Sequence, residues 1–231
     1  KAPPELFEHV KRLGGGKELI EGYGITECSP VVTITPPKTP ANGVGKPVPG
    51  VELCVIHVDT NEKIPSDQRG EICIHGDNVF RGYLGKDAQD PFIEIEGKKW
   101  YRSGDLGHID TDGSLILGGR LKRFVKIGGE MVSLMALEDE LNAYAFTQGL
   151  MKKDAEEPQL AIGVKEGTKP SLILFTTFDL DKDVANDVLK EAGFARIVKL
   201  AGAYQIKEIP MTGTGKVQFR KIRELIEEKH A

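Results

Sequence analysis

The spacing of apolar residues changes near residue 120, and this change constrains the fold more than any other feature of the chain. From Val31 to Gly119, short apolar runs rich in β-branched residues stand between glycines and prolines, which is typical of short strands. Beyond this point, strand-like runs alternate with segments of helical spacing. The sequence therefore predicts an α+β chain. A β-rich, distorted barrel-like subdomain over 1–121 is joined by a hinge to a small α+β domain over 122–231.

Within the first part, the clearest local predictions are strands at 51–56 and 71–74. Asp112-Gly113 lies between two apolar runs and is a signal for a two-residue hairpin turn. The three predictions together favour antiparallel pairing between strands that are close in sequence.

In the second part, Ser133 is a suitable N-cap for a helix whose apolar residues recur at helical spacing. Two apolar strands follow it, and a further strand is predicted at 204–209. A closing helix is expected from about Val217, with Phe219 facing inward.

The composition excludes several classes of function. The chain has 31 Lys and Arg against 35 Asp and Glu, which gives a net charge of −4, and it has no basic block, so no nucleic-acid partner is expected. None of its apolar stretches approaches the roughly 20 residues of a membrane-spanning helix. The three cysteines form no CxxC pair and the five histidines have no metal-ligand spacing, which argues against a disulfide framework and a zinc site.

The segment Gly22–Glu27 (GYGITE) gathers two glycines, an aromatic ring, a hydroxyl and a carboxylate in one turn. Tyr23 could stack on a base, Gly24 would let a backbone approach a ligand, and Glu27 could hold Mg²⁺ beside a phosphate. The alternative is a plain turn capped by Thr26. The spacing alone favours that alternative.

Two candidate positions lie close to the boundary. Asp105, in YRSGDL, could accept hydrogen bonds from both hydroxyls of a ribose, although an aspartate that caps turn amides is equally expected there. The segment 118–123 (GGRLKR) has the small residues of a hinge, and its Arg120 could bind a phosphate or ribose oxygen. An ordinary basic linker is the alternative.

Two glycine-containing segments follow. Pro210–Lys216 (PMTGTGK) lies between a strand and the last helix, where a lysine could reach an anion. It lacks the GxxxxGK[ST] pattern of a P-loop. Gly128 and Gly129, in KIGGEMVS, could line a narrow tunnel or form a tight turn, and by themselves they favour the turn.

Taken in order, YGITE, YRSGDL, GRLKRFVKIGGEMVS and PMTGTGK resemble four consecutive core motifs of the adenylate-forming superfamily, which includes acyl-CoA synthetases, peptide-synthetase adenylation domains and luciferases. The resemblance extends from about Gly22 to Lys216. The phrase KIGGEMVSL, with LFTT further on, is most similar to the bifunctional acyl-ACP synthetase/2-acylglycerophosphoethanolamine acyltransferases.

The resemblance implies a two-step ligase that uses ATP and Mg²⁺. A fatty acid attacks the α-phosphate of ATP to give acyl-AMP, and the phosphopantetheine thiol of an acyl carrier protein then displaces AMP. It also implies a lysophospholipid as a partner of the whole enzyme, and a place on the cytoplasmic side, with possible association with the inner membrane.

The same resemblance assigns roles to residues and makes the second domain a mobile lid. The implied roles are adenine stacking for Tyr23 in a cofactor-binding turn with Gly24, phosphate contact for Thr26, Mg²⁺ binding for Glu27, ribose binding for Asp105, ribose or phosphate contact for Arg120, a hinge at Lys122, a pantetheine channel at Gly128 and Gly129, and catalysis of adenylation by Lys216.

One family feature has no counterpart in this sequence. The Ser/Thr/Gly-rich phosphate loop that precedes YGxTE in the family is absent, so the chain is expected to be the C-terminal part of a longer enzyme and not to form acyl-AMP alone. An acyl-CoA synthetase or fatty acyl-AMP ligase is the alternative enzyme. A non-catalytic module that binds a nucleotide or a partner is the alternative outside enzymes.

Overall fold

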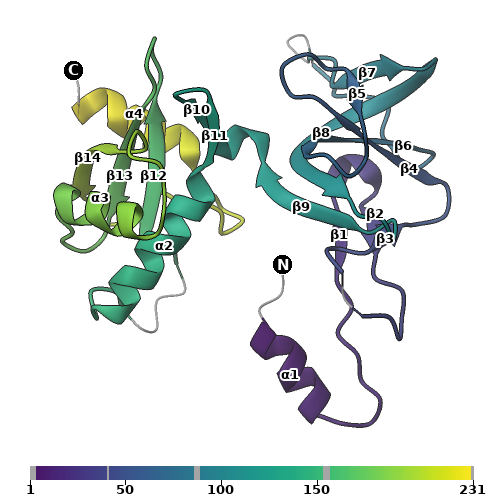
Figure 1. Cartoon of the computed structure of the whole chain (residues 1–231), viewed down its shortest axis with the longest axis horizontal. Helices are drawn as coiled ribbons and strands as arrows, with labels where there is room; N and C mark the ends of the chain where they lie inside the picture. The colour runs from purple at the N-terminus through teal and green to yellow at the C-terminus, as the bar shows by residue number, and fades with distance from the viewer. Residues whose placement is uncertain (1–3, 41, 86–88, 153–156, 230–231) are drawn as a thin grey trace. The chain divides into compact units, whose positions relative to one another are not determined.

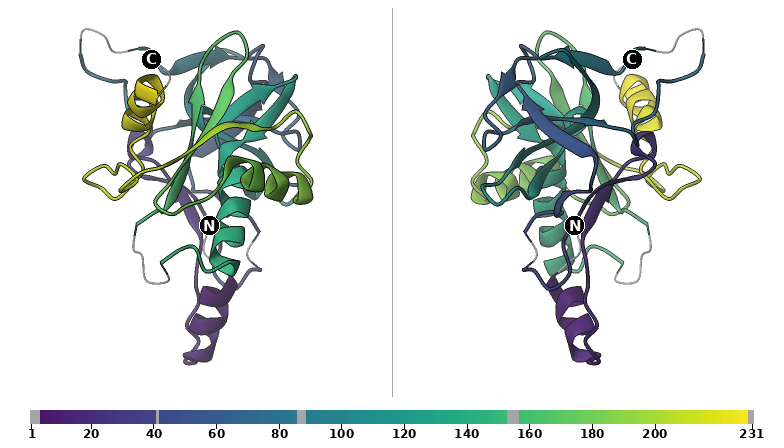
Figure 2. Two further views of the ribbon diagram at one scale, coloured as in Figure 1. Left: turned by 90° about the vertical axis from the view of Figure 1, so that its left-hand side faces the viewer. Right: turned by 90° about the vertical axis from the view of Figure 1, so that its right-hand side faces the viewer.

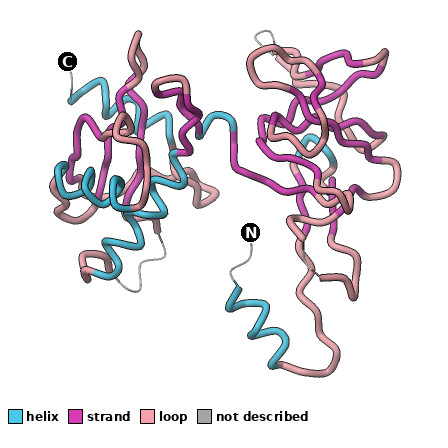
Figure 3. Tube along the Cα trace, in the orientation of Figure 1, coloured by secondary structure: helices cyan, strands magenta, loops and turns pink. Residues whose placement is uncertain are grey.

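The computed structural model describes residues 4–40, 42–85, 89–152 and 157–229. Its backbone contacts divide the chain into two compact units, Lys1–Leu121 and Lys122–Ala231. Each unit has its own sheets and core (Figures 1 and 3). The fold is α+β, as the sequence predicts, and rich in strands.

The first unit is built mainly from antiparallel strands. A larger sheet has the order β5-β4-β6-β8-β7, with β9 also paired to β8, and is barrel-like and nearly closed. A smaller sheet has the order β1-β2-β3. The elements are α1 (Pro4–Arg12), β1 (Gly22–Gly24), the 3₁₀ turn η1 (Thr26–Cys28), β2 (Val31–Ile34), β3 (Lys46–Pro47), β4 (Val51–Ile56), β5 (Lys63–Ile64), β6 (Gly70–Gly76), β7 (Phe92–Ile95), β8 (Lys98–Ile109) and β9 (Leu115–Arg120).

Strand β6 and the second half of strand β4 are buried on both faces. On one face Val55 and Ile72 pack into the main core of this unit. On the other face Cys54 and Cys73, which are register partners, pack against Trp100. Because both faces are covered, the two strands have continuous apolar runs rather than an alternating pattern, and the strands predicted at 51–56 and 71–74 are confirmed.

The hairpin between β8 and β9 forms at the predicted place, but its turn is longer than predicted. Asp110 and Ser114 still pair through a backbone hydrogen bond of 2.9 Å, so the loop has three residues, 111–113, and the two-residue prediction is wrong. The physical reason is side-chain capping. The Asp110 carboxylate accepts from the backbone N–H of Thr111 at 2.7 Å, and that of Asp112 accepts from Ser114 at 2.9 Å.

The second unit has a three-stranded sheet, β12-β13-β14, in which β13 and β14 run parallel. Helices α2 and α3 pack on one face and α4 on the other (Figure 2). The elements are the 3₁₀ turn η2 (Leu121–Arg123), β10 (Phe124–Ile127), β11 (Glu130–Ser133), α2 (Leu134–Thr147), β12 (Leu160–Lys165), β13 (Ser171–Thr176), α3 (Lys182–Glu191), β14 (Leu200–Gln205) and α4 (Phe219–Lys229).

Ser133 caps α2 as predicted, accepting from the backbone N–H of Ala136 at 3.2 Å. The strand predicted at 204–209 instead occupies Leu200–Gln205. Its parallel partner β13 ends at Thr176, opposite Gln205, so the ladder cannot continue along the apolar run.

The closing helix also differs from the prediction. It begins at Phe219, because Val217 is engaged in a β-bridge with Met211. Phe219 does not face the core: it is 38% exposed, and the Arg123 guanidinium lies over its ring at 4.0 Å. None of the described helices has the length and apolar character that a membrane span requires.

Candidate functional site

Asp105 lies at a bulge of β8. Three residues of this strand, 103–105, stand opposite the single residue Ile72 of β6, so the chain arches there. The backbone N–H of Asp105 donates to the Ser103 hydroxyl at 3.0 Å, and the residue is only 5% exposed. The bulge therefore holds a carboxyl group below the surface.

Side chains from two other strands meet this carboxyl group. The hydroxyl of Tyr23, on β1, donates to Oδ2 of Asp105 at 2.5 Å. Arg120, on β9, is the register partner of Asp105, and its Nε lies 3.2 Å from Oδ1. The structure thus brings together three of the predicted site residues that are far apart in sequence.

Burial dominates the electrostatics of this group. It raises the pKa of Asp105 above the ordinary value for aspartate, while the hydrogen bond from Tyr23 and the charge of Arg120 oppose the shift. Burial, and then the charge of Asp105, raise the pKa of Tyr23 well above its ordinary value. Tyr23 therefore stays protonated and acts as a hydrogen-bond donor.

Glu27 lies in η1, where residues of the segment that follows β6 contact it. The Tyr83 hydroxyl donates to its Oε1 at 2.7 Å, and the backbone N–H of Phe80 donates to its carbonyl oxygen at 2.8 Å. Thr26, in the same turn, is exposed. One hydrogen bond therefore orients the carboxylate of Glu27 through Oε1 and another holds its backbone. No hydrogen bond from a described residue to Oε2 is present.

Gly24 and Cys28 have structural explanations. A side chain at Gly24 would collide with the carbonyl oxygen of Pro30, so the turn itself requires glycine. Cys28 is fully buried and free. Burial, and then the charge of Glu27, raise the pKa of its thiol to about 11, so it is neutral near pH 7 and is not an activated nucleophile.

Lys216 lies in an exposed loop of the second unit. The loop is closed at its base, since the backbone N–H of Thr212 donates to the Lys216 carbonyl at 2.7 Å and Lys216 donates back to the Thr212 hydroxyl at 3.1 Å. The residue itself is exposed. The Lys216 ammonium group, on a closed loop that faces solvent, can therefore contact an anion that lies outside the second unit.

The other predicted residues of the second unit lie on or beside the β10–β11 hairpin. Lys122 is exposed in the 3₁₀ turn η2. Gly128 and Gly129 connect the two strands as a two-residue loop with positive φ of 60° and 93°, as a type I′ turn requires. Their interpretation as a tight turn is confirmed.

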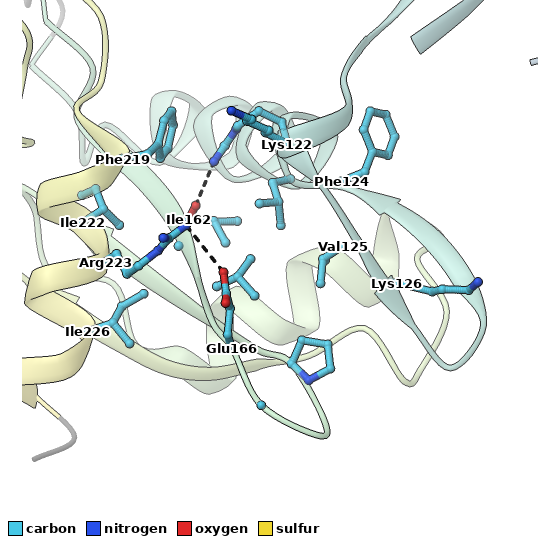
Figure 4. Close-up of a pocket in the computed structure, with 16 residues that line it drawn as sticks. Lys122, Phe124, Val125, Lys126, Ile162, Glu166, Phe219, Ile222, Arg223 and Ile226 are labelled. Carbon is cyan, nitrogen blue, oxygen red and sulfur yellow. Dashed lines mark hydrogen bonds and ion pairs between the residues drawn. The ribbon is translucent and has the colours of Figure 1, made fainter. Parts of the chain in front are cut away.

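A cavity of about 550 Å³ lies in the second unit between β10, β12 and α4 (Figure 4). Its wall combines apolar side chains such as Ile162 and Ile222 with the ion pair of Arg223 and Glu166. Lys122 alone among the predicted site residues lines it. None of the residues that line this cavity belongs to the group around Asp105.

The donor set for Mg²⁺ is small. Among the described residues, no group of three or more His, Cys, Asp or Glu side chains could hold a metal ion. Glu27 is the single carboxylate that the motif resemblance offers for Mg²⁺. Mg²⁺ usually binds through one or two carboxylates together with waters and substrate phosphates. A single oriented carboxylate with one open oxygen fits that pattern.

Several residues that organise the site escaped sequence analysis. Tyr83 holds Glu27, while Glu71 and Arg102 form a short ion pair beside the bulge of Asp105. The one available signal was a charged residue, Glu71, directly ahead of the apolar run that forms β6.

Comparison with known proteins gives matches in sequence over most of the chain. The sequence model of the family described as AMP-binding enzyme matches residues 1–84. Luciferin 4-monooxygenase of Photinus pyralis is 32% identical over 213 residues, which are 89% of this chain and 37% of that protein. The mitochondrial medium-chain acyl-CoA ligase ACSF2 of Rattus norvegicus is 30% identical over an alignment of 237 positions, which covers 98% of this chain and 37% of that protein.

Solved structures agree in fold. ATP-bound MatB from Rhodopseudomonas palustris superposes with a TM-score of 0.71 at 23% identity, covering 94% of this chain and 42% of that one. The O-succinylbenzoate coenzyme A synthetase of Bacillus subtilis in complex with AMP has a TM-score of 0.69 at 21% identity, covering 96% and 44%.

The chain therefore shares its fold with MatB and with the O-succinylbenzoate coenzyme A synthetase. The matches support the adenylate-forming, AMP-binding enzyme superfamily as the group that this chain resembles. The chain spans 37–40% of the length of the curated relatives it matches first.

Proposed function

We propose that this chain is the nucleotide-handling part of an ATP-dependent ligase that activates a fatty acid as acyl-AMP and passes the acyl group to a thiol. The observation that carries the proposal is the group of Tyr23, Asp105 and Arg120. It presents a buried carboxylate, held from two sides, on strands that the sequence separates widely.

In the first step the first unit binds ATP. Asp105 accepts hydrogen bonds from the ribose hydroxyls, Tyr23 packs its ring on adenine, and Arg120 contacts ribose or phosphate oxygens. Thr26 contacts the phosphate. Glu27 would hold Mg²⁺, which supplies positive charge where negative charge accumulates.

Lys216 supplies the second positive charge of adenylation. A carboxylate and a phosphate repel each other until cations compensate the charge that develops between them. An ammonium group on an exposed loop can meet that charge and withdraw afterwards, with Lys122 as the pivot of the lid. Gly128 and Gly129, at the tip of the β10–β11 hairpin, border the path of the incoming pantetheine thiol.

Two acceptors are compatible with this chemistry. The phrase KIGGEMVSL favours the phosphopantetheine arm of an acyl carrier protein, in an enzyme that also acylates a lysophospholipid on the cytoplasmic side of the inner membrane. Coenzyme A is the second candidate, because curated relatives include a medium-chain acyl-CoA ligase and 4-coumarate–CoA ligases.

Fatty-acid-dependent exchange of labelled pyrophosphate into ATP tests the first step, and a choice of thiol tests the second. The full-length protein is expected to catalyse exchange only with a fatty acid present, and then to release AMP faster with holo carrier protein than with coenzyme A. Faster release with coenzyme A would replace the carrier protein by the second candidate. Absence of exchange with any acid would contradict the ligase assignment.

A further inference from the structure

Glu71 is a buried carboxylate to which the proposed reaction gives no role. It is the second residue of β6 and is 2% exposed, and the following residues of the strand are core residues. A charged group at such depth is unfavourable unless ion pairs and hydrogen bonds compensate it. Its contacts should therefore indicate why it is there.

Among the described residues, the partners of Glu71 lie in the bulge of β8 that carries Asp105 or directly before it. Its Oε2 accepts from Arg102 through Nη2 at 2.5 Å and Nε at 3.1 Å. Its Oε1 accepts from the backbone N–H of Gly104 at 3.2 Å. One carboxylate thus holds the residue directly before the bulge and the residue directly before Asp105.

Ser103 completes the support of the bulge. Its hydroxyl donates to the carbonyl oxygen of Ile72 at 2.7 Å and accepts from the backbone N–H of Asp105 at 3.0 Å. The strand β6 therefore contacts the bulge through Glu71 and through the carbonyl of Ile72. These contacts fix the backbone from which the Asp105 side chain projects.

We propose that Glu71 is a positioning residue for Asp105: by fixing the bulge, it sets the direction in which the Asp105 carboxylate meets the two ribose hydroxyls of the nucleotide. This inference rests on the proposed function and extends it. Glu71 acts through Asp105 and does not touch the nucleotide.

The test compares ATP with 2′,3′-dideoxy-ATP, which lacks the two hydroxyls. Dissociation constants are measured by titration calorimetry on the full-length protein. Hydrogen bonds to a charged group should make wild type prefer ATP by at least about tenfold. In Glu71→Gln the amide NH₂ faces either Arg102 or the Gly104 N–H, both donors. The preference should then fall below about threefold, with dideoxy-ATP affinity unchanged.

Glu52→Gln is the matched control. Glu52 is a β4 glutamate that is 53% exposed and pairs with Lys98 at 2.8 Å, away from the bulge. The control should keep the full preference for ATP. Melting temperatures verify that each variant is folded. If Glu71→Gln does not fold, Arg102→Lys keeps the charge and loses the guanidinium geometry at Glu71, and it should reduce the preference in the same way.

The outcomes separate the inference from the function on which it rests. Equal weakening of both nucleotides in Glu71→Gln, or an unchanged preference, overturns the positioning role. If Asp105→Asn loses the preference while Glu71→Gln keeps it, the ribose role of Asp105 stands and the inference alone fails. If wild type shows no preference, both fail.

Discussion

At the scale of single residues, the environment of Asp105 combines two opposing influences. Burial favours the neutral acid, whereas the Tyr23 hydroxyl and the Arg120 guanidinium favour the carboxylate. Because burial prevails, the folded protein holds a proton on this group at a higher pH than the unfolded chain does. The group is therefore a source of pH-dependent stability as well as a candidate ligand for ribose.

The substitution Asp105→Asn tests this balance. With the pKa raised in the folded state, the contribution of Asp105 is fully present below about pH 3.9, the ordinary aspartate pKa, and is lost as the pH rises through the folded-state value. Urea unfolding between pH 4 and 7 should show the free energy of wild type decreasing relative to Asp105→Asn with rising pH. A relative increase would mean that hydrogen bonding outweighs burial.

Sequence analysis identified the residues of this group one at a time but not their contacts. Tyr23, Asp105 and Arg120 meet only because β1, β8 and β9 converge, and the spacing of motifs does not encode that convergence. Glu71 was missed for a similar reason. Its partners lie more than 30 positions away, so nothing local distinguishes it from a charged residue at a strand edge.

At the scale of elements, sequence patterns predicted the features that depend on residues close together in the sequence. The cap of α2 follows from Ser133 and the helical spacing behind it. The end of β14 does not, since it is set by the end of β13 across the sheet. The β8–β9 turn is a local feature that the Asp-Gly signal did not capture, because the carboxylates of Asp110 and Asp112 both cap backbone groups and lengthen the loop.

The cap of α2 gives a prediction for one element. Replacing Ser133 by alanine removes the acceptor for the Ala136 N–H and should lower the free energy of unfolding by about 1 kcal/mol. Thr147→Ala is the control, because this exposed hydroxyl only donates to the Ala143 carbonyl within the same helix. Urea unfolding of both variants measures the difference. An equal effect of the two substitutions would contradict the capping role.

At the scale of the whole molecule, each unit has a hydrophobic core of its own. The first is centred on residues such as Ile72 and Leu115, and the second on residues such as Leu137 and Leu174. The change of apolar spacing near residue 120 predicted two kinds of architecture because strands and helices bury apolar residues at different periods. Spacing does not predict that the two units act in one reaction, and that proposal rests on the motifs and on the relatives.

The central claim is that the two units serve a single adenylation reaction, and Lys216 tests it most directly. In the full-length protein, Lys216→Ala should reduce fatty-acid-dependent ATP–pyrophosphate exchange about 10²–10³-fold. Thioester formation from synthetic acyl-AMP should change by less than about threefold, because the lysine acts only in the first step. Lys207→Ala, at another exposed lysine of the same unit, should leave both rates unchanged. Exchange by Lys216→Ala at the wild-type rate would contradict the account.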